Sequence, residues 1–536
     1  MADTVDAASL KGWLADGGEI ALVDVGEAGQ FAAGHPFLAA SLPYSRFELD
    51  IAALVPRRGV RLVVCDHGAG VAERAAGRAE ALGYRRVFVL GGGVAAWARA
   101  GYTLYEGVNV PSKTFGELVE HERATPHVTA DELAAMRAAG EDFVLVDGRT
   151  FAEFQRFAIP GGISCPNGEL ALRIDDLAPD PRTRIVVNCA GRTRSIIGAQ
   201  TLIDLGVPNP VVALENGTQG WVLAGHRLET GASRRHGRAM PADVARRRER
   251  AGRHARARGV GFVGAGEVSA WLGDEGRTTY VFDVRSGEER ADAPAAGLVH
   301  APGGQLVQAS DQWVGVRNAR IVVADEELVR APMVAAWLRE LGFEAHALAG
   351  GVAAAADIVW PDAAVWPAVA EPAPISAGEL KDALGRGDVR AIDLRSSAAY
   401  RAGHVAAARW SIRPNLLRDF ADAGGMGVLI ADLAGIAGLA AGDLAEAGFA
   451  ECRLLAGTPV DWAAAGLAIE ATPKAPADAE CLDFVSFTHG RHHGDAAASR
   501  RYLEWELGLI GQLDAAERAV FRIAPGRGAA FPPARG

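Results

Sequence analysis

Residues 185–195 read IVVNCAGRTRS, and the next eleven residues read IIGAQTLIDLG. The apolar run that opens this stretch is typical of a buried strand, and the apolar residues after Ser195 recur at helical spacing as far as Gly206. Cys189 therefore lies where a strand ends and a helix begins. The free N–H groups of the turn and the helix dipole favour a thiolate there, and two arginines in the turn add fixed positive charge. The stretch predicts a reactive sulfur nucleophile.

The whole chain has the composition of a globular protein with several domains. Its 536 residues exceed what one hydrophobic core can organise. Hydrophobic residues make up 49% and charged residues 23%, and the net charge of −11 argues against general nucleic-acid binding. No run approaches the roughly 18 apolar residues of a membrane span, and the N-terminus lacks the pattern of a signal peptide. We therefore expect neither nucleic acid nor a membrane as a partner.

The cysteines indicate a reducing environment. They are few and scattered, and no two of them form a C-x-x-C pair. An odd and sparse set of this kind does not make a disulfide framework, so we expect a cytoplasmic protein. The five are Cys65, Cys165, Cys189, Cys452 and Cys481.

The pattern around Cys189 recurs three more times. Similar strand–turn–helix stretches occupy residues 61–83, 320–342 and 427–448, and each of the four is preceded by a strand that closes on an aspartate. Strands that alternate with helices predict parallel sheets with helices on both faces. The predicted fold class is therefore α/β, with four tandem domains, each a mainly parallel sheet flanked by helices, and a short helical C-terminal tail. The domains are expected at residues 1–108, 125–232, 260–357 and 374–470, and the tail at residues 480–525.

The segments between these domains have the character of linkers. Residues 105–125 are polar and contain Pro111, and residues 231–258 hold ten arginines with interspersed alanines. We interpret the arginine-rich segment as an exposed helical linker. A nucleic-acid-binding patch is the alternative, but the run has no interleaved aromatic residues and the protein is acidic.

The register of the repeats decides which residue occupies the nucleophile position. Cys189 precedes the glycine that ends its helix by 17 residues, and the same interval leads to Asp66 in the first repeat and to Asp325 in the third. In the fourth repeat the nearest match is Asp432, one residue closer to its glycine. Because aspartate is no sulfur nucleophile, we expect one catalytic domain, the second, and three inactive copies.

Cys65 competes with Cys189 for the catalytic role. It immediately precedes Asp66, and the sequence CDHGAG resembles an active loop. In the register above it is the last residue of its strand, with a buried side chain that acts as a small hydrophobe. A slip of one residue would reverse this interpretation, because alternate strand positions face opposite sides of a sheet.

Together these features resemble the rhodanese superfamily, and the arrangement is similar to that of tandem four-domain rhodanese-like sulfurtransferases. The resemblance covers residues 1 to about 470, and rests on the loop CAGRTRS at 189–195, the segment Asp147-Gly148-Arg149 and residues 217–221. It implies a thiosulfate sulfurtransferase, whose cysteine takes a sulfane sulfur from a donor such as thiosulfate. The resulting persulfide passes that sulfur to cyanide or a thiol. The implied partners are small-molecule donors and acceptors, with a protein thiol as a further acceptor, and no cofactor or metal is implied.

Each residue of the loop has an expected role in that reaction. Cys189 forms the persulfide as a preformed thiolate, without help from a histidine. Arg192 and Arg194 pair with the sulfonate of the donor, unless they form only a solvated surface pair. Asp147 and Arg149 brace the fold beneath the site. The other substrate-binding residues shape the loop, with N–H groups that cradle the sulfur, a glycine for the tight turn and a serine that caps or begins the helix: Ala190, Gly191, Thr193 and Ser195.

Two further features of the sequence allow either a functional or a structural interpretation. Cys165 could resolve a persulfide by forming a disulfide, although a structural role fits it better. In the tail, Tyr502 and the apolar residues at helical spacing after it predict a helix that packs against a domain or a second subunit, and the latter would give a homodimer. His489, His492 and His493 invite a metal site, but the glycines around them favour a loop.

Two other functions compete with sulfur transfer. Cys-dependent phosphatases of the same fold family place an arginine six residues after the cysteine, whereas Arg194 follows Cys189 at five. A non-enzymatic scaffold or persulfide carrier would hand the sulfur of Cys189 to one partner protein. Sulfur transfer to or from small molecules requires the thiol to face a pocket that opens to solvent.

Overall fold

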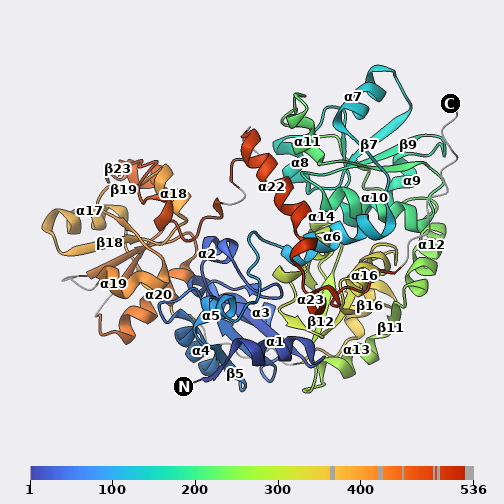
Figure 1. The fold of residues 1–536 in the computed structure, drawn as a ribbon. Helices are drawn as coiled ribbons and strands as arrows, with labels where there is room; N and C mark the ends of the chain where they lie inside the picture. The colour runs from blue at the N-terminus through green and yellow to red at the C-terminus, as the bar shows by residue number, and fades with distance from the viewer. Residues whose placement is uncertain are drawn as a thin grey trace. The chain divides into compact units, whose positions relative to one another are not determined.

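A computed structural model describes residues 2–361, 369–420, 426–449, 452–486, 489–491 and 495–524. It contains four α/β domains, each built around a mainly parallel sheet flanked by helices (Figure 1), and thereby confirms the predicted fold class. The chain divides into two compact units. The first unit is Met1–Gly12, Ala21–Val108 and Ala363–Phe487, and the second unit is Trp13–Ile20, Asn109–Asp362 and Thr488–Gly536.

The second domain, which carries Cys189, belongs to the second unit. Its sheet has the strand order β6-β10-β9-β7-β8, and all its pairs are parallel. The strands are β6 (His127–Val128), β7 (Phe143–Asp147), β8 (Ile163–Ser164), β9 (Arg184–Asn188) and β10 (Val211–Leu214). The helices are α7 (Ala130–Ala138), α8 (Phe151–Arg156), α9 (Leu170–Leu177), α10 (Thr193–Leu205) and α11 (Gly217–Leu223).

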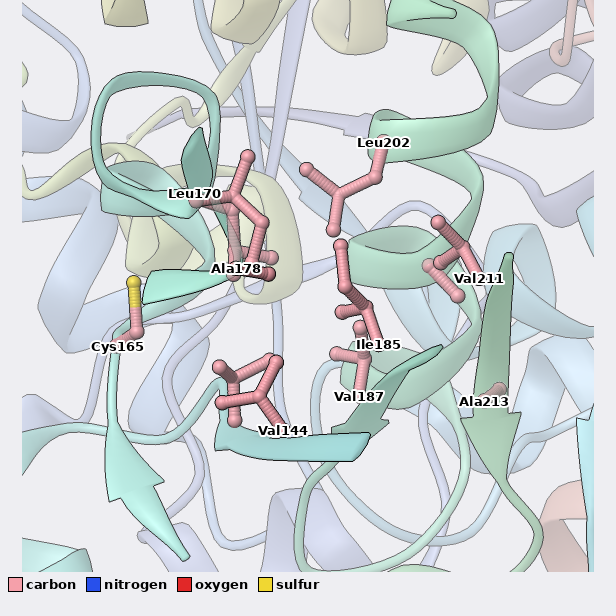
Figure 2. Close-up of a cluster of buried hydrophobic side chains, with 12 residues drawn as sticks. Val144, Cys165, Leu170, Ala178, Ile185, Val187, Leu202, Val211 and Ala213 are labelled. Atoms are coloured by element: carbon pink, nitrogen blue, oxygen red, sulfur yellow. The ribbon is translucent and has the colours of Figure 1, made fainter. Parts of the chain in front are cut away.

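Alternation of side chains along the central strands gives this domain two cores. On one face Val144 and Val187 pack with apolar residues of α9 and α10 (Figure 2). On the other face Leu145 and Val186 pack with Trp221 of α11. Neighbouring residues of a strand point to opposite faces, so a continuous apolar run is what a sheet covered on both sides requires.

The third domain repeats this arrangement in the second unit. Its strand order is β11-β16-β15-β12-β13, again with parallel pairs. The strands are β11 (Gly261–Val263), β12 (Thr279–Asp283), β13 (Val299–His300), β15 (Arg320–Ala324) and β16 (Glu344–Leu348). The helices are α13 (Ala265–Leu272), α14 (Gly287–Asp292), α15 (Gly303–Gln308) and α16 (Arg330–Glu340).

The first unit holds the first and fourth sheets. The first has the order β1-β5-β4-β2 with β3 beside β2, and the fourth has the order β17-β22-β21-β18-β20 with an added antiparallel pair, β19 and β23. The strands are β1 (Asp3–Val5), β2 (Ile20–Asp24), β3 (Ala40–Ser41), β4 (Arg61–Cys65), β5 (Val87–Leu90), β17 (Ala373–Pro374), β18 (Val389–Asp393), β19 (His404–Val405), β20 (Arg409–Trp410), β21 (Met426–Ile430), β22 (Cys452–Leu455) and β23 (Ile469–Glu470). The helices are α1 (Ala7–Ala15), α2 (Ala28–Ala33), α3 (Phe47–Leu54), α4 (Val71–Ala81), α5 (Gly93–Arg99), α17 (Ala377–Arg386), α18 (Ser397–Ala402), α19 (Leu416–Phe420), α20 (Ala434–Glu446) and α21 (Pro459–Ala464).

Two segments that were expected to be linkers are helices with buried faces. One contains α6 (Val110–Arg123), which packs along α10. The other contains α12 (Val244–Ala257), so the expected helix is present and exposed along one face, but its other face is buried. Arg247 and Ala251 are buried, because Arg247 pairs with Asp176 at the end of α9. This arginine is therefore neutralised within the protein.

The C-terminal tail forms a helix that packs on the second domain. This helix, α22 (Ala496–Gly508), contains Tyr502 as predicted and lies against α6 and α11 (Figure 1). A short helix, α23 (Ala515–Arg518), follows it. Within the described ranges, none of the helices has both the length and the apolar character that crossing a membrane demands.

Strand pairing fixes which residue of each repeat occupies the nucleophile position. In the last three domains, the aspartate that closes one strand pairs with the final residue of the central strand. The next residue is Cys189 in the second domain, Asp325 in the third and Ala431 in the fourth. The expectation of Asp432 in the fourth domain is therefore wrong, because the pairing of β18 with β21 places Ala431 there.

In the first domain the same position belongs to Asp66. Cys65 is the final residue of β4 and is fully buried. The carbonyl oxygen of Asp66 accepts a hydrogen bond from the N–H of Val94, just as the carbonyl of Cys189 accepts one from Thr218 at 2.8 Å. These two contacts put Asp66, and not Cys65, in register with Cys189.

A glycine is required where the following loop meets this position. Gly217 has a φ of +52°, and a Cβ atom there would lie 2.3 Å from the carbonyl oxygen of Cys189. Gly93 and Gly351 approach the corresponding carbonyls of the first and third domains in the same way. The glycine that recurs after these strands therefore lets the backbone close against the loop.

Replacing Gly217 with alanine should lower the stability of the second domain by about 1–3 kcal/mol or more, because the left-handed backbone is strained for alanine and the new Cβ displaces the backbone of Cys189. Thermal denaturation of the full chain measures this change. The matched control is Gly77→Ala, within α4, where an added Cβ meets nothing within 4 Å. That variant should be neutral or up to about 1 kcal/mol more stable, and equal melting temperatures for the two variants would contradict this account.

Candidate active site

Cys189 lies directly after β9, at the approach to α10. Its sulfur accepts a hydrogen bond of 3.0 Å from the hydroxyl of Ser195, in the first turn of that helix. The residue is only 2% exposed. The expectation that the sulfur faces solvent is therefore wrong for this structure.

A buried ion pair supports the loop from the neighbouring strand. Arg149 donates to the carboxylate of Asp147 through Nε at 2.9 Å and Nη2 at 2.7 Å, and both side chains are buried. Asn188, the residue before the cysteine, donates to the same carboxylate at 2.9 Å. These contacts are those of a structural brace beneath the site.

Arg192 is already paired with carboxylates of α6. Its Nε and Nη2 atoms donate to Glu117 at 2.8 and 2.9 Å, and Nη2 also contacts Glu120. The side chain is 7% exposed. A donor anion would therefore have to share Arg192 with Glu117, so the interpretation as a solvated surface pair does not apply to this arginine.

Arg194 is held in the same manner by a carboxylate of α8. Its two terminal nitrogens donate to Glu153 at 2.8 and 2.9 Å. Burial acts to raise the pKa of Glu153, but Arg194 prevails and lowers it to about 2, so the pair is ionised. Arg194 also lines a cavity of about 320 Å³, together with Phe151 and Arg235 of this domain and residues of the third domain.

Two helices outside the predicted site complete its surroundings. From α6, Lys113 reaches Glu506 of α22 at 3.1 Å and also contacts the hydroxyl of Tyr502. Glu506 in turn accepts a hydrogen bond of 2.7 Å from the hydroxyl of Thr193, at the start of α10. Nothing near Cys189 in the sequence points to these residues. The signal for α6 was its own helical spacing after Pro111, within a segment that looked like a linker.

Comparisons with known proteins agree with this geometry. The family model of the rhodanese-like domain matches residues 6–100 and 129–224. A crystal structure of thiosulfate sulfurtransferase from Pseudomonas aeruginosa is 40% identical in sequence and covers 97% of this chain and 99% of that chain, with a TM-score of 0.88. The chain belongs to the rhodanese superfamily. Within that superfamily it is a member of the sulfurtransferase family.

A second relative is similar in sequence to this rhodanese over a shorter stretch. The HTH-type transcriptional regulator Rv0324 of Mycobacterium tuberculosis is 36% identical over 110 residues, which cover 20% of this chain. The match spans 47% of that protein, so this chain covers about half of the relative's length.

The smaller residues of the rhodanese loop are all buried. Ala190 accepts hydrogen bonds at its carbonyl oxygen from the backbone and side-chain nitrogens of Gln219, both at 3.1 Å. Gly191 lies close to the C-terminal helix, since a Cβ there would lie 3.1 Å from Oε2 of Glu506. Ser195 was expected to cap or begin the helix, and it lies in the first turn, where its contact is with the sulfur.

Acidic groups outnumber basic ones around the loop, in contrast to the positive site that the sequence suggested. Among the described residues, the loop and the side chains that pair with it carry three basic groups and four acidic ones. The basic residues are Lys113, Arg192 and Arg194, and the acidic residues are Glu117, Glu120, Glu153 and Glu506. Burial, which outweighs the attraction of Arg192, raises the pKa of Glu117 to about 7.

Three other groups singled out in the sequence lie apart from this loop. Cys165 belongs to the apolar core beside α9 (Figure 2), which fits a structural role, and burial raises the pKa of its thiol and of Cys65. His492 and His493 lie outside the described residues. Among the residues that are described, including His489, no group of three or more His, Cys, Asp or Glu side chains is placed to hold a metal ion.

The aspartates of two other domains occupy the position of the nucleophile as bound anions. The carboxylate of Asp66 accepts hydrogen bonds from the N–H groups of Val71 and Ala72 at 2.9 and 3.0 Å. Asp325 accepts them from Val329 and Arg330 at 3.0 and 2.9 Å. In both domains the donors belong to the start of the following helix, so this position favours negative charge.

Glu117→Gln should remove a pH-dependent cost to stability. Because the folded-state pKa of Glu117 is raised from 4.5 to about 7, its contribution to stability is present below pH 4.5 and is lost as the pH rises through 7. The variant should therefore be about 1–3 kcal/mol more stable relative to wild type at pH 8 than at pH 4. Urea unfolding at both pH values measures this, with Glu122→Gln, exposed on the same helix, as control. If the stability difference between the variant and wild type is the same at both pH values, that result would contradict the raised pKa of Glu117.

Proposed function

We propose that this rhodanese moves a sulfane sulfur from thiosulfate or a related donor to a thiophilic acceptor, cyanide or a thiol, through a persulfide on Cys189. The observation that carries the proposal is the register of strand β9. It puts a cysteine in the second domain where Asp66, Asp325 and Ala431 stand in the others. The similarity to a thiosulfate sulfurtransferase over nearly the whole chain supports the same activity.

The reaction follows from nucleophilic catalysis in two steps. The thiolate of Cys189 attacks the outer sulfur of thiosulfate, the S–S bond of the donor breaks, and sulfite leaves with the bonding electron pair. The acceptor then attacks the outer sulfur of the persulfide, which releases thiocyanate when the acceptor is cyanide and regenerates the thiolate. Each step has a lower barrier than direct transfer. Because the donor product leaves before the acceptor reacts, the two steps predict ping-pong kinetics.

The surroundings of the cysteine suit both charged forms of the sulfur. The hydroxyl of Ser195 donates to the sulfur at 3.0 Å. The equivalent position holds a carboxylate in the first and third domains, bound by N–H groups at the start of a helix. By the same register, the start of α10 would stabilise the thiolate and the outer sulfur of the persulfide.

The burial of Cys189 also supports a second candidate, a carrier that transfers sulfur to one partner protein. Cys189 is 2% exposed, and α22 lies over part of its loop through Glu506 and Tyr502. Small donors then need a displacement of these neighbours, whereas a protein partner could supply that displacement by binding. The carrier predicts slow turnover with cyanide but rapid transfer to a cognate thiol.

Cys189→Ser should abolish turnover of thiosulfate and cyanide and also the 32-Da adduct that mass spectrometry detects on the peptide containing residue 189 after treatment with thiosulfate. Cys65→Ser should retain both, because Cys65 is the last residue of β4 and Asp66, the next residue, is the one in register with Cys189. The assay is thiocyanate formation by purified protein at several thiosulfate concentrations. Activity that survives in the Cys189 variant and disappears in the Cys65 variant would reverse the register. An adduct on Cys189 without cyanide turnover would favour the carrier.

A further inference from the structure

A carboxylate from the C-terminal helix lies against the catalytic loop of the second domain. Glu506 of α22 is fully buried, and its Oε1 atom accepts hydrogen bonds from Thr193 Oγ1 at 2.7 Å and from Lys113 Nζ at 3.1 Å. Its other oxygen, Oε2, is buried and has no hydrogen-bond partner among the described residues. That oxygen faces the loop, since a Cβ on Gly191 would lie 3.1 Å from it.

The groups that hold Glu506 are those that an anionic ligand would use. Lys113 supplies an ammonium group, and Thr193 supplies a hydroxyl at the positive end of α10. Burial acts to raise the pKa of Glu506, but Lys113 and Thr193 hold it below its ordinary value, so the carboxylate is ionised. A negative charge is thus bound at the start of the catalytic helix before any substrate arrives.

We propose that Glu506 and Lys113 determine the charge of the ligands that reach the Cys189 loop, with Glu506 acting as an internal anion that competes with small sulfonate or carboxylate ligands. The inference rests on the proposed role of Cys189 in sulfur transfer. An anion approaching the loop meets the unpaired oxygen of Glu506, and it gains Lys113 only when that carboxylate gives way. A neutral ligand of the same size does not compete for Lys113 and meets only the steric cover of α22.

The charges of the described residues support this competition. With Glu506 in place, the loop and its paired side chains carry four acidic and three basic groups. Without the charge of Glu506 the two numbers are equal, and Lys113 loses the carboxylate with which it forms its ion pair. Glu506, which touches the loop, and Lys113, which acts through Glu506, are therefore specificity-determining residues that take no part in the bond exchange.

Alkylation of Cys189 by two reagents of similar size and different charge tests the proposal. Iodoacetate is an anion and iodoacetamide is neutral, and peptide mass spectrometry gives the rate at Cys189 for each. In Glu506→Gln, which keeps the shape and an acceptor for Thr193, iodoacetate should react about fivefold faster, equivalent to about 1 kcal/mol. Iodoacetamide should change by less than about twofold. Glu504→Gln, exposed on the same helix, should change neither rate.

Three results would overturn the proposal. Equal acceleration of both reagents in Glu506→Gln would mean that α22 acts only as steric cover, and an unchanged rate for iodoacetate would mean that the carboxylate does not compete. Lys113→Met provides a second check. Combined with Glu506→Gln, it should abolish the increase in the rate of alkylation by iodoacetate. Persistence of that gain in the double variant would also overturn the proposal. Melting curves of each variant establish that it is folded.

The alkylation rates do not depend on sulfur transfer, so the two proposals can fail separately. Charge selectivity without any 32-Da adduct on Cys189 would leave this inference standing and remove the proposed function. Persulfide formation without charge selectivity would do the reverse.

Discussion

The junction between β9 and α10 is the constraint on which the site depends. Strand β9 is paired with β7 on one side and β10 on the other, so its end cannot shift by a residue without breaking both sets of hydrogen bonds. This fixes Cys189 at the approach to the helix. The close contact of Gly217 with the carbonyl of Cys189 then determines the path of the loop. The chemistry proposed for the thiol follows from that position, because the start of a helix favours negative charge.

The same junction explains how three copies of the fold can be present without a nucleophile. In the first and third domains an aspartate accepts hydrogen bonds from the N–H groups that begin the next helix. The carboxylate satisfies donors that would otherwise need water or a ligand. These loops are therefore closed by their own side chain, whereas the loop of the second domain carries the sulfur. One residue separates the two outcomes in otherwise matching strand arrangements.

Features set by residues close together in the sequence could be predicted. Contacts between residues far apart in the sequence could not. Four repeated patterns gave the α/β fold, and helix-end spacing put Asp66 and Asp325 in register with Cys189. The prediction of Asp432 at the nucleophile position of the fourth domain was wrong because it was based on the residue type. The strand pairing places Ala431 there. The partners of the loop were missed because they come from far along the chain. Glu117 is 75 residues from Arg192, and Glu506 is 313 residues from Thr193.

Because of that separation in sequence, the loop and the helix that contacts it are synthesised at different times. Domains fold largely as they leave the ribosome, so the second domain and its loop are complete long before Glu506 is translated. Throughout synthesis of the third and fourth domains, the face of the loop that α22 later contacts stays bare. A nascent chain therefore lacks the contacts of Glu506 and Tyr502 with this loop until its last long helix has docked.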